Sequence, residues 1–330
     1  MLNDIFSNRY SSVLLWDEFT ENDRKILVQG FKIISEQLFP YWINGRESQT
    51  AKKHWNSIHD KLAMELGQKE LSPKWLVTYP LTINQVCENF MFADYNNSYV
   101  ADKFIKDRIS FIELAFREKH EQLTPKTPNN QERNQAIQNL FKRHPSSPYI
   151  STQKTPTELF KESIIELNER LKFAKYPLTY HNGIIQISKD DLAEEQIYKP
   201  FWSLTSSSCW DNVDIDMKKA LHMRDIGSPD PAFYAAKALE SAIKIISDTK
   251  NWSHGNEKGA HNYIDNLGSK KNGQFINQWE KDFLKSFFTN VRNPFGHGAG
   301  SDDMPKLSPQ QTDWAIETCM SWIKNLITRS

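Results

Sequence analysis

Apolar residues recur at intervals of three and four positions along most of the chain, and this spacing predicts amphipathic helices. Two of them begin with a capping box, Thr20 with Asp23 and Thr155 with Glu158, in which a threonine and an acid satisfy free backbone amides. A weaker pattern favours a further helix at 82–92. The stronger patterns predict helices over residues 21–39, 55–67, 98–120, 155–173, 217–226, 231–248, 275–291 and 308–328.

One short segment alternates apolar and polar positions and predicts a β-hairpin. It contains the pair Asn182-Gly183, and these residue types adopt the positive φ angles that a two-residue hairpin turn requires. Polar, proline-containing stretches at 123–131 and after residue 141 predict exposed loops. The sequence therefore predicts an all-α protein, mainly helical, with one small β-hairpin.

The last two predicted helices carry very regular apolar stripes. Aromatic and aliphatic residues at this spacing form a packed core far more often than they hold a cofactor. We therefore expect the two helices to pack on each other through Ile276, Trp279, Phe283, Leu284, Phe287, Phe288 and Val291 on one side and Ala315, Cys319, Trp322, Ile323 and Leu326 on the other.

The composition restricts the kind of partner that the protein can bind. The chain of 330 residues has 41 Lys and Arg and 41 Asp and Glu, so it lacks the broad positive field of a non-specific nucleic-acid or membrane binder. Any RNA binding must therefore be local. At about 150 residues per domain, the length suggests two domains, which we place at residues 1–200 and 201–330.

The cysteine pattern and the absence of long apolar runs indicate the cellular compartment in which the protein is expected. Cys87, Cys209 and Cys319 are scattered and form no C-x-x-C pair, so the sequence encodes neither a disulfide framework nor a zinc ribbon. No signal peptide and no apolar run of about 18 residues is present, which argues against secretion and membrane insertion. We expect a cytoplasmic protein without membrane contact.

The segment V-R-N-P-F-G-H-G-A-G, residues 291–300, joins the last two predicted helices. Pro294 obstructs continuation of the helix, and the glycines allow tight turns that bring Arg292 and His297 together. Arginine binds phosphate oxygens with a permanent charge, and histidine transfers protons near neutral pH. The pair therefore suits metal-free phosphodiester cleavage.

Each of these residues also has a purely structural interpretation. Arg292 would then bind helix-end carbonyls or a surface carboxylate, Asn293 would cap the helix C-terminus, and His297 would bond the loop backbone. Two Asp-x-Lys fragments of the restriction-nuclease kind lie in helical contexts without strands, and the other histidines lack metal-ligand spacing.

Arg292-Asn293-x-x-x-His297, followed by Gly298, resembles the R-x4-6-H motif of the HEPN superfamily of helical ribonucleases. The region from about residue 205, with A-A-K-A-L-E-S-A-I-K at 235–244, is similar to the abortive-infection protein-like C-terminal domain. The segments I-F-S-N-R-Y and L-W-D-E-F-T near the start resemble AbiJ-type N-terminal domains. The resemblance thus implies an N-terminal sensor or regulatory domain followed by a C-terminal HEPN helical bundle.

The resemblance also implies an activity. HEPN ribonucleases typically act as dimers whose two motifs face one cleft, and those of this kind serve in antiphage abortive infection. By this resemblance, His297 acts on the ribose 2′-hydroxyl or the leaving oxygen, and Arg292 balances charge on the phosphorane. Asn293 orients the histidine or holds a phosphate oxygen, and Glu240 is a candidate polar partner. Neither metal nor cofactor is needed, and the product is a 2′,3′-cyclic phosphate.

Further residues and partners follow less directly. Lys258, His261 and Lys270 either line an RNA cleft or lie in exposed loops, and Glu240 could instead be a solvated residue beside an apolar stripe. Expected partners are RNA, a second copy through the HEPN domain, and an antitoxin or a phage-derived trigger. The alternative is a non-catalytic HEPN module that binds RNA, a nucleotide or a protein.

Overall fold

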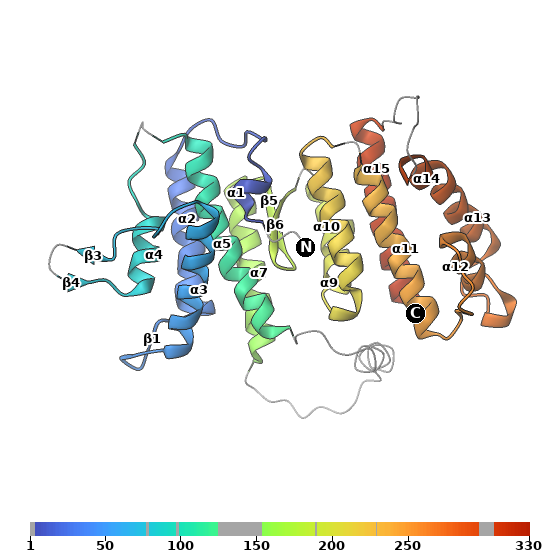
Figure 1. The fold of residues 1–330 in the computed structure, drawn as a ribbon, viewed down its shortest axis with the longest axis horizontal. Helices are drawn as coiled ribbons and strands as arrows, with labels where there is room; N and C mark the ends of the chain where they lie inside the picture. The colour runs from blue at the N-terminus through green and yellow to red at the C-terminus, as the bar shows by residue number, and fades with distance from the viewer. Residues whose placement is uncertain are drawn as a thin grey trace. The chain divides into compact units, whose positions relative to one another are not determined.

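The structure is a computed structural model that describes residues 4–76, 79–96, 99–124, 154–188, 190–228, 230–296 and 307–330. As the hydrophobic spacing predicts, these residues are mainly helical (Figure 1). They form two compact units: an N-terminal unit of residues 4–124 and 154–188, and a C-terminal unit that begins at residue 190. The two compact units divide between residues 189 and 190. The domain boundary that the sequence places after residue 200, and the roles assigned to the two parts, stay predictions.

The N-terminal unit is built from helices and three short antiparallel strand pairs. Its elements are α1 (Phe6–Arg9), α2 (Glu21–Lys32), the π-helix η1 (Ile33–Leu38), β1 (Trp42–Ile43), β2 (Arg46–Glu47), α3 (Gln49–Glu65), β3 (Trp75–Leu76), β4 (Tyr79–Pro80), α4 (Ile83–Met91), α5 (Ala101–Leu123), α7 (Pro156–Phe173), β5 (Leu178–His181) and β6 (Ile184–Ile187).

The predicted hairpin is confirmed as β5 and β6, which pair antiparallel with Leu178 opposite Ile187. Its turn residues Asn182 and Gly183 have φ angles of 40° and 90°, as the Asn-Gly pair requires. The two other ladders, β1–β2 and β3–β4, were not predicted, because strands of two residues are too short to show an alternating pattern.

The long helix α5 lies in the middle of the N-terminal unit, where α1, α2, α3, α7, η1 and β6 all contact it. Its residues 104–116 are buried without interruption, charged residues included. The Glu113 carboxylate accepts hydrogen bonds from Arg9 Nη1 at 3.0 Å, Arg117 Nη2 at 2.6 Å and the Ile185 backbone N–H at 2.7 Å. One buried carboxylate therefore joins the start of the chain and the hairpin to α5.

The described residues of the C-terminal unit form helices and connecting turns, and no strand occurs among them. Its elements are α8 (Asp191–Ala193), the π-helix η2 (Glu194–Tyr198), α9 (Lys199–Leu204), the 3-10 helix η3 (Ser208–Trp210), α10 (Asp211–Asp225), α11 (Pro231–Thr249), α12 (Ala260–Leu267), the 3-10 helix η4 (Lys270–Asn272), α13 (Gln278–Phe287), the π-helix η5 (Phe288–Arg292), α14 (Asn293–Gly296) and α15 (Pro309–Arg329).

Helix α11 forms the core of this unit, because α10, α12, α15 and η5 pack around it. Its buried face is rich in alanine, which lets neighbouring helices approach closely. Segment 190–204 also belongs to this core: Tyr198, Phe201 and Trp202 are buried with α10, α11 and α15 residues. The C-terminal unit therefore begins well before its first long helix.

The predicted contact between the last two helices is confirmed, with one correction. Most positions of both stripes are buried, but Trp279 is 65% exposed and Phe283 38% exposed, so neither is a core residue. The stripe on α13 is wider than the face that this helix buries. Both rings instead contact Trp322 of α15 at the surface of the unit.

Two further expectations concern the predicted loops and the absence of membrane insertion. The loops predicted near 123–131 and after residue 141 lie largely outside the described residues. Within the described ranges, no helix combines the length and the apolar character needed to cross a membrane.

The Glu113→Gln substitution should lower the free energy of unfolding by about 3 kcal/mol, because it leaves the buried guanidinium of Arg9 and the partly buried one of Arg117 without their carboxylate. Urea denaturation followed by circular dichroism measures this. The matched control is Glu21→Gln, whose side chain is 89% exposed beside Arg24, and it should leave the midpoint unchanged. Equal midpoints for both variants would contradict the role of Glu113.

A fragment of residues 190–330 should unfold cooperatively, whereas a fragment of residues 206–330 should melt at a much lower temperature or fail to fold. The shorter fragment lacks Tyr198, Phe201 and Trp202, and loss of one large buried aromatic side chain typically costs about 3–5 kcal/mol. Thermal melts of the two fragments test this. Indistinguishable melts would show that segment 190–204 does not support the core.

Candidate functional site

Arg292 lies at the end of η5 and faces α11. Its Nη2 is 3.6 Å from Glu240 Oε2, and its Nη1 donates to Asn293 Oδ1 at 3.3 Å. The guanidinium carbon is 5.5 Å from the centre of the Phe233 ring, within the range of a cation–π contact. Three neighbours thus hold the head group of a side chain that is 29% exposed.

The local backbone differs from the predicted loop. Helix α13 widens into the π-helix η5 and continues as α14 over Asn293–Gly296, so Pro294 does not end the helical conformation. Proline removes one backbone N–H from this run of helical residues, and a proline at such a position normally kinks or ends a helix. A π-helical turn places Arg292 differently from a regular α-turn, and such turns are frequent at functional sites.

Glu240 on α11 is a partner of Arg292 rather than a solvated edge residue. Its side chain is 12% exposed, and its second oxygen, Oε1, is 2.7 Å from Lys244 Nζ. The carboxylate is thus shared by two cations, one from its own helix and one from η5. Its position on α11 and its burial fix the end of η5 against this helix.

The charge balance leaves this cluster cationic. Arg292 and Lys244 carry two formal positive charges and Glu240 one negative charge, so the three groups sum to one positive charge. Among the described residues, no hydrogen-bond partner is found for the buried Nε of Arg292, while the side chain as a whole is 29% exposed. A partly exposed guanidinium with residual positive charge around it is suited to bind a phosphate group.

Of the three predicted substrate-binding residues, the structure places one beside η5, the helix that carries Arg292. His261, on α12, is exposed, and its Nε2 lies 3.4 Å from Thr289 Oγ1 on η5. Lys258 and Lys270 are exposed in the loop before α12 and in η4, and no described contact joins their side chains to Arg292 or Glu240. Their role stays a prediction.

Two members of the cluster escaped sequence reasoning. Lys244 follows Glu240 by four residues, a spacing that predicts an ion pair on one helix face and could have identified it. Phe233 precedes Glu240 by two helical turns, which places it on the same side of α11, but nothing in the sequence shows that it contacts an arginine.

His297, the predicted acid–base group, lies outside the described residues. Asn293 is described, and its amide oxygen binds Arg292, the residue before it. The proximity of Arg292 and His297 therefore stays a prediction from the sequence.

Other chemistries find little support in the described part of the chain. No group of three or more His, Cys, Asp or Glu side chains is placed there to hold a metal ion. All three cysteines are buried and carry thiols, and burial raises the pKa of the Cys87 and Cys319 thiols above its ordinary value. The cysteines therefore act as packing groups and not as nucleophiles.

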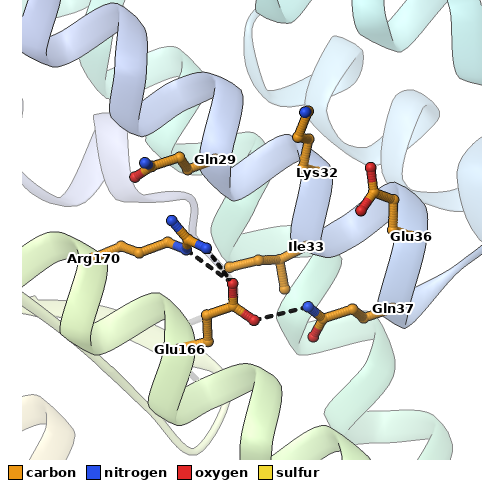
Figure 2. A pocket seen from close by; sticks show the side chains of 7 residues that line it. All are labelled: Gln29, Lys32, Ile33, Glu36, Gln37, Glu166 and Arg170. Atoms are coloured by element: carbon orange, nitrogen blue, oxygen red, sulfur yellow. Dashed lines mark hydrogen bonds and ion pairs between the residues drawn. The ribbon is translucent and has the colours of Figure 1, made fainter.

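The N-terminal unit contains a separate polar groove of about 280 Å³, lined by Gln29, Lys32, Ile33, Glu36, Gln37, Glu166 and Arg170. As Figure 2 shows, Glu166 lies between Arg170 and Gln37: it accepts from Arg170 Nε at 3.0 Å and from Gln37 Nε2 at 2.8 Å. These bonds lower the pKa of the Glu166 carboxyl and keep it ionised. One wall is formed by the end of α2 and the π-helix η1, and the other by α7.

The comparison with protein families concerns mainly the N-terminal unit. The family model of AbiJ N-terminal domain 4 matches residues 4–203, and thus also most of the segment that packs into the core of the C-terminal unit. No curated protein and no solved structure matches the chain. Since the match covers more than half of the 330 residues, the chain belongs to the AbiJ N-terminal domain 4 family, a family of abortive-infection proteins.

Proposed function

We propose that this protein is a metal-independent HEPN endoribonuclease that acts as a toxin in antiphage abortive infection. The observation that carries the proposal is the state of Arg292: a partly exposed guanidinium held by Glu240 and Phe233 in a cluster of net positive charge. Membership of an abortive-infection family supplies the biological context.

The proposed reaction is an internal transfer at one phosphodiester of RNA. The ribose 2′-hydroxyl oxygen bonds to phosphorus, the bond from phosphorus to the 5′ oxygen breaks, and a 2′,3′-cyclic phosphate remains. His297 accepts the hydroxyl proton, while an acid or water protonates the leaving 5′ oxygen. Arg292 stabilises the negative charge that develops on the phosphoryl oxygens, and Asn293 orients the groups around it.

Glu240 acts as a positioning residue in this mechanism. Because it binds both Arg292 and Lys244, it fixes the direction of the guanidinium without touching RNA. His261, placed beside η5 by its contact with Thr289, is suited to bind the RNA backbone or a base nearby. Lys258 and Lys270 extend this surface in the proposal.

The proposal includes a homodimer. The net charge of the chain is zero, and the cluster at Arg292 supplies one surplus positive charge, which is little for binding a polyanion. Two copies that present their motifs to one cleft double this charge. The composite site would also supply two histidines, one to take a proton and one to give it.

We assign sensing or regulation to the N-terminal unit. The polar groove between η1 and α7 supports this role, because its walls are held by hydrogen bonds while Gln29 and Lys32 present donors to it. In the proposal the toxin stays inactive in the cytoplasm until an antitoxin is lost or a phage-derived trigger binds.

Purified protein should cleave RNA in EDTA, and Arg292→Ala and His297→Ala should each reduce the cleavage rate at least about 100-fold. The products should carry 2′,3′-cyclic phosphate ends, which phosphatase resistance and end-specific ligation detect. Matched controls are Arg24→Ala, an exposed arginine of the other unit, and His254→Ala, an exposed histidine of the same unit. Both should retain wild-type rates.

Several outcomes would reject the mechanism. Cleavage that requires Mg²⁺, or that survives both substitutions, is incompatible with an Arg–His site. Binding of RNA, a nucleotide or a protein without cleavage would favour the non-catalytic HEPN module.

The Glu240→Gln variant should lower kcat about tenfold while KM stays constant or falls. The reason is that the neutral amide orients Arg292 less firmly but leaves two uncompensated cations to attract RNA. The control is Glu195→Gln, which removes the acid from another Glu–Lys pair at the same four-residue spacing, on an exposed surface. A rise in KM at constant kcat would instead indicate that Glu240 supports RNA binding.

A further inference from the structure

The described part of the N-terminal unit buries three Lys and Arg side chains: Arg9, Lys106 and Arg108. Two of them are compensated, since Arg9 and Lys106 each form an ion pair with a carboxylate. Arg108 on α5 has no carboxylate at ion-pair distance among the same residues, and the adjacent Asp107 is paired with Lys103 at 3.0 Å. Buried charges in proteins are normally paired, so Arg108 is an exception.

Two phenyl rings contact the Arg108 guanidinium instead. Its central carbon lies 3.3 Å from the centre of the Phe104 ring, one turn earlier on α5, and 4.8 Å from the centre of the Phe90 ring on α4. Cation–π contacts of this kind stabilise a cation but do not neutralise it. Burial lowers the pKa of Arg108 to about 10, and the nearby Asp107 and Tyr99 raise it by less. Arg108 is therefore cationic at neutral pH.

Most hydrogen-bond donors of Arg108 have no acceptor in the described part of the chain. Nη1 donates to the Phe104 carbonyl oxygen at 2.9 Å, whereas Nε is buried and finds no acceptor there. Nη2 also has no described acceptor, but it is not one of the fully buried atoms, so it lies at the 5% of the residue that is exposed. Nε and Nη2 form the edge of a guanidinium that binds two oxygens of one phosphate or carboxylate.

Aromatic side chains border this part of α5. The rings of Tyr99, Tyr95 and Phe19 lie 5.5 Å, 5.3 Å and 5.2 Å from the Phe104 ring. Tyr99 is 51% exposed, and an exposed aromatic face is a surface on which any nucleobase stacks. Because Phe104 contacts both the Arg108 guanidinium and the Tyr99 ring, the two are separated by a distance that a single nucleotide spans.

We propose that Arg108 binds the phosphate group of a small nucleotide whose base stacks on Tyr99. The phosphate accepts from Nε and Nη2, which lack described acceptors, and compensates the buried charge. A simple carboxylate would bind the guanidinium equally well but would make no use of the exposed ring. A polynucleotide fits less well, because its other phosphates require further cations, and Lys103 on the same helix is already paired.

This site is separate from the polar groove of the same unit. It lies on α4, α5 and the residues just before α5, and it shares no residue with the groove formed by α2, η1 and α7. Binding of the nucleotide does not depend on any ribonuclease activity. Its meaning as a signal received by the N-terminal unit rests on the proposed function.

The test is isothermal titration calorimetry of the full chain with the four nucleoside monophosphates, the matching nucleosides and inorganic phosphate. At least one nucleotide should bind more tightly than its nucleoside and than phosphate, since each of these lacks one of the two contacts. Arg108→Met should weaken its binding about 30-fold, the effect of losing charged hydrogen bonds. The matched control is Arg46→Met, which changes an exposed arginine on β2 and should bind like the wild type.

Thermal melts separate ligand binding from a purely structural role. Without ligand, Arg108→Met should melt at the wild-type temperature or above it, because it removes an uncompensated buried charge and keeps an apolar chain between the two rings. It should also lose the rise in melting temperature that the nucleotide causes in the wild type.

Two further variants keep the test decisive if Arg108→Met does not fold. Arg108→Lys retains the charge but not the bidentate edge, and it should weaken nucleotide binding about tenfold. Tyr99→Ala, at an exposed position, should abolish the preference for the nucleotide over inorganic phosphate and leave phosphate binding unchanged.

The outcomes distinguish this inference from the proposed ribonuclease. A wild-type chain that binds neither nucleotides nor phosphate at millimolar concentration, or Arg108 variants that bind them undiminished, would overturn it. So would Tyr99→Ala with an unchanged preference for the nucleotide. Nucleotide binding that depends on Arg108, in a protein that cleaves no RNA, would support the inference while the proposed function fails.

Discussion

The arrangement of the candidate site depends on one shared carboxylate. Glu240 is nearly buried on α11, and a buried negative charge is stable only when cations compensate it. Lys244 does so from the same helix and Arg292 from the end of η5. The attraction therefore fixes the direction of the Arg292 side chain. It also fixes the last turn of η5, from which the rest of the motif continues. A neutral residue at position 240 would leave the end of η5 without this anchor.

Both units follow the same principle. In each, a central helix carries an acidic residue that is nearly or fully buried and binds two cations: Glu113 with Arg9 and Arg117, and Glu240 with Lys244 and Arg292. In the N-terminal unit the carboxylate is saturated by protein donors, which makes it structural. In the C-terminal unit the arginine is 29% exposed, which leaves capacity for a ligand. The structural cluster at Glu113 and the candidate site at Glu240 thus differ in whether a cation keeps the capacity to bind a ligand.

The sequence predicted the long helices and the Asn-Gly hairpin, because their signals are local: spacing, capping boxes and turn residues. It failed where the result depends on tertiary contacts. The stripe of α13 looked uniformly apolar, yet the tertiary packing of the C-terminal unit decides that Leu284 enters the core and that Trp279 stays exposed. Likewise, Arg292 was recognisable from its motif, whereas its contact with Phe233 joins two helices far apart in sequence.

The position of segment 190–204 bears on how such proteins can be recombined. The family domain reaches residue 203, but Phe201 and Trp202 fill the interior of the C-terminal unit. A crossover placed at the family boundary would separate these side chains from the cavity that they occupy. Chimeras that exchange C-terminal units between relatives should therefore be joined near residue 190, so that each C-terminal unit keeps the aromatic side chains that fill its core.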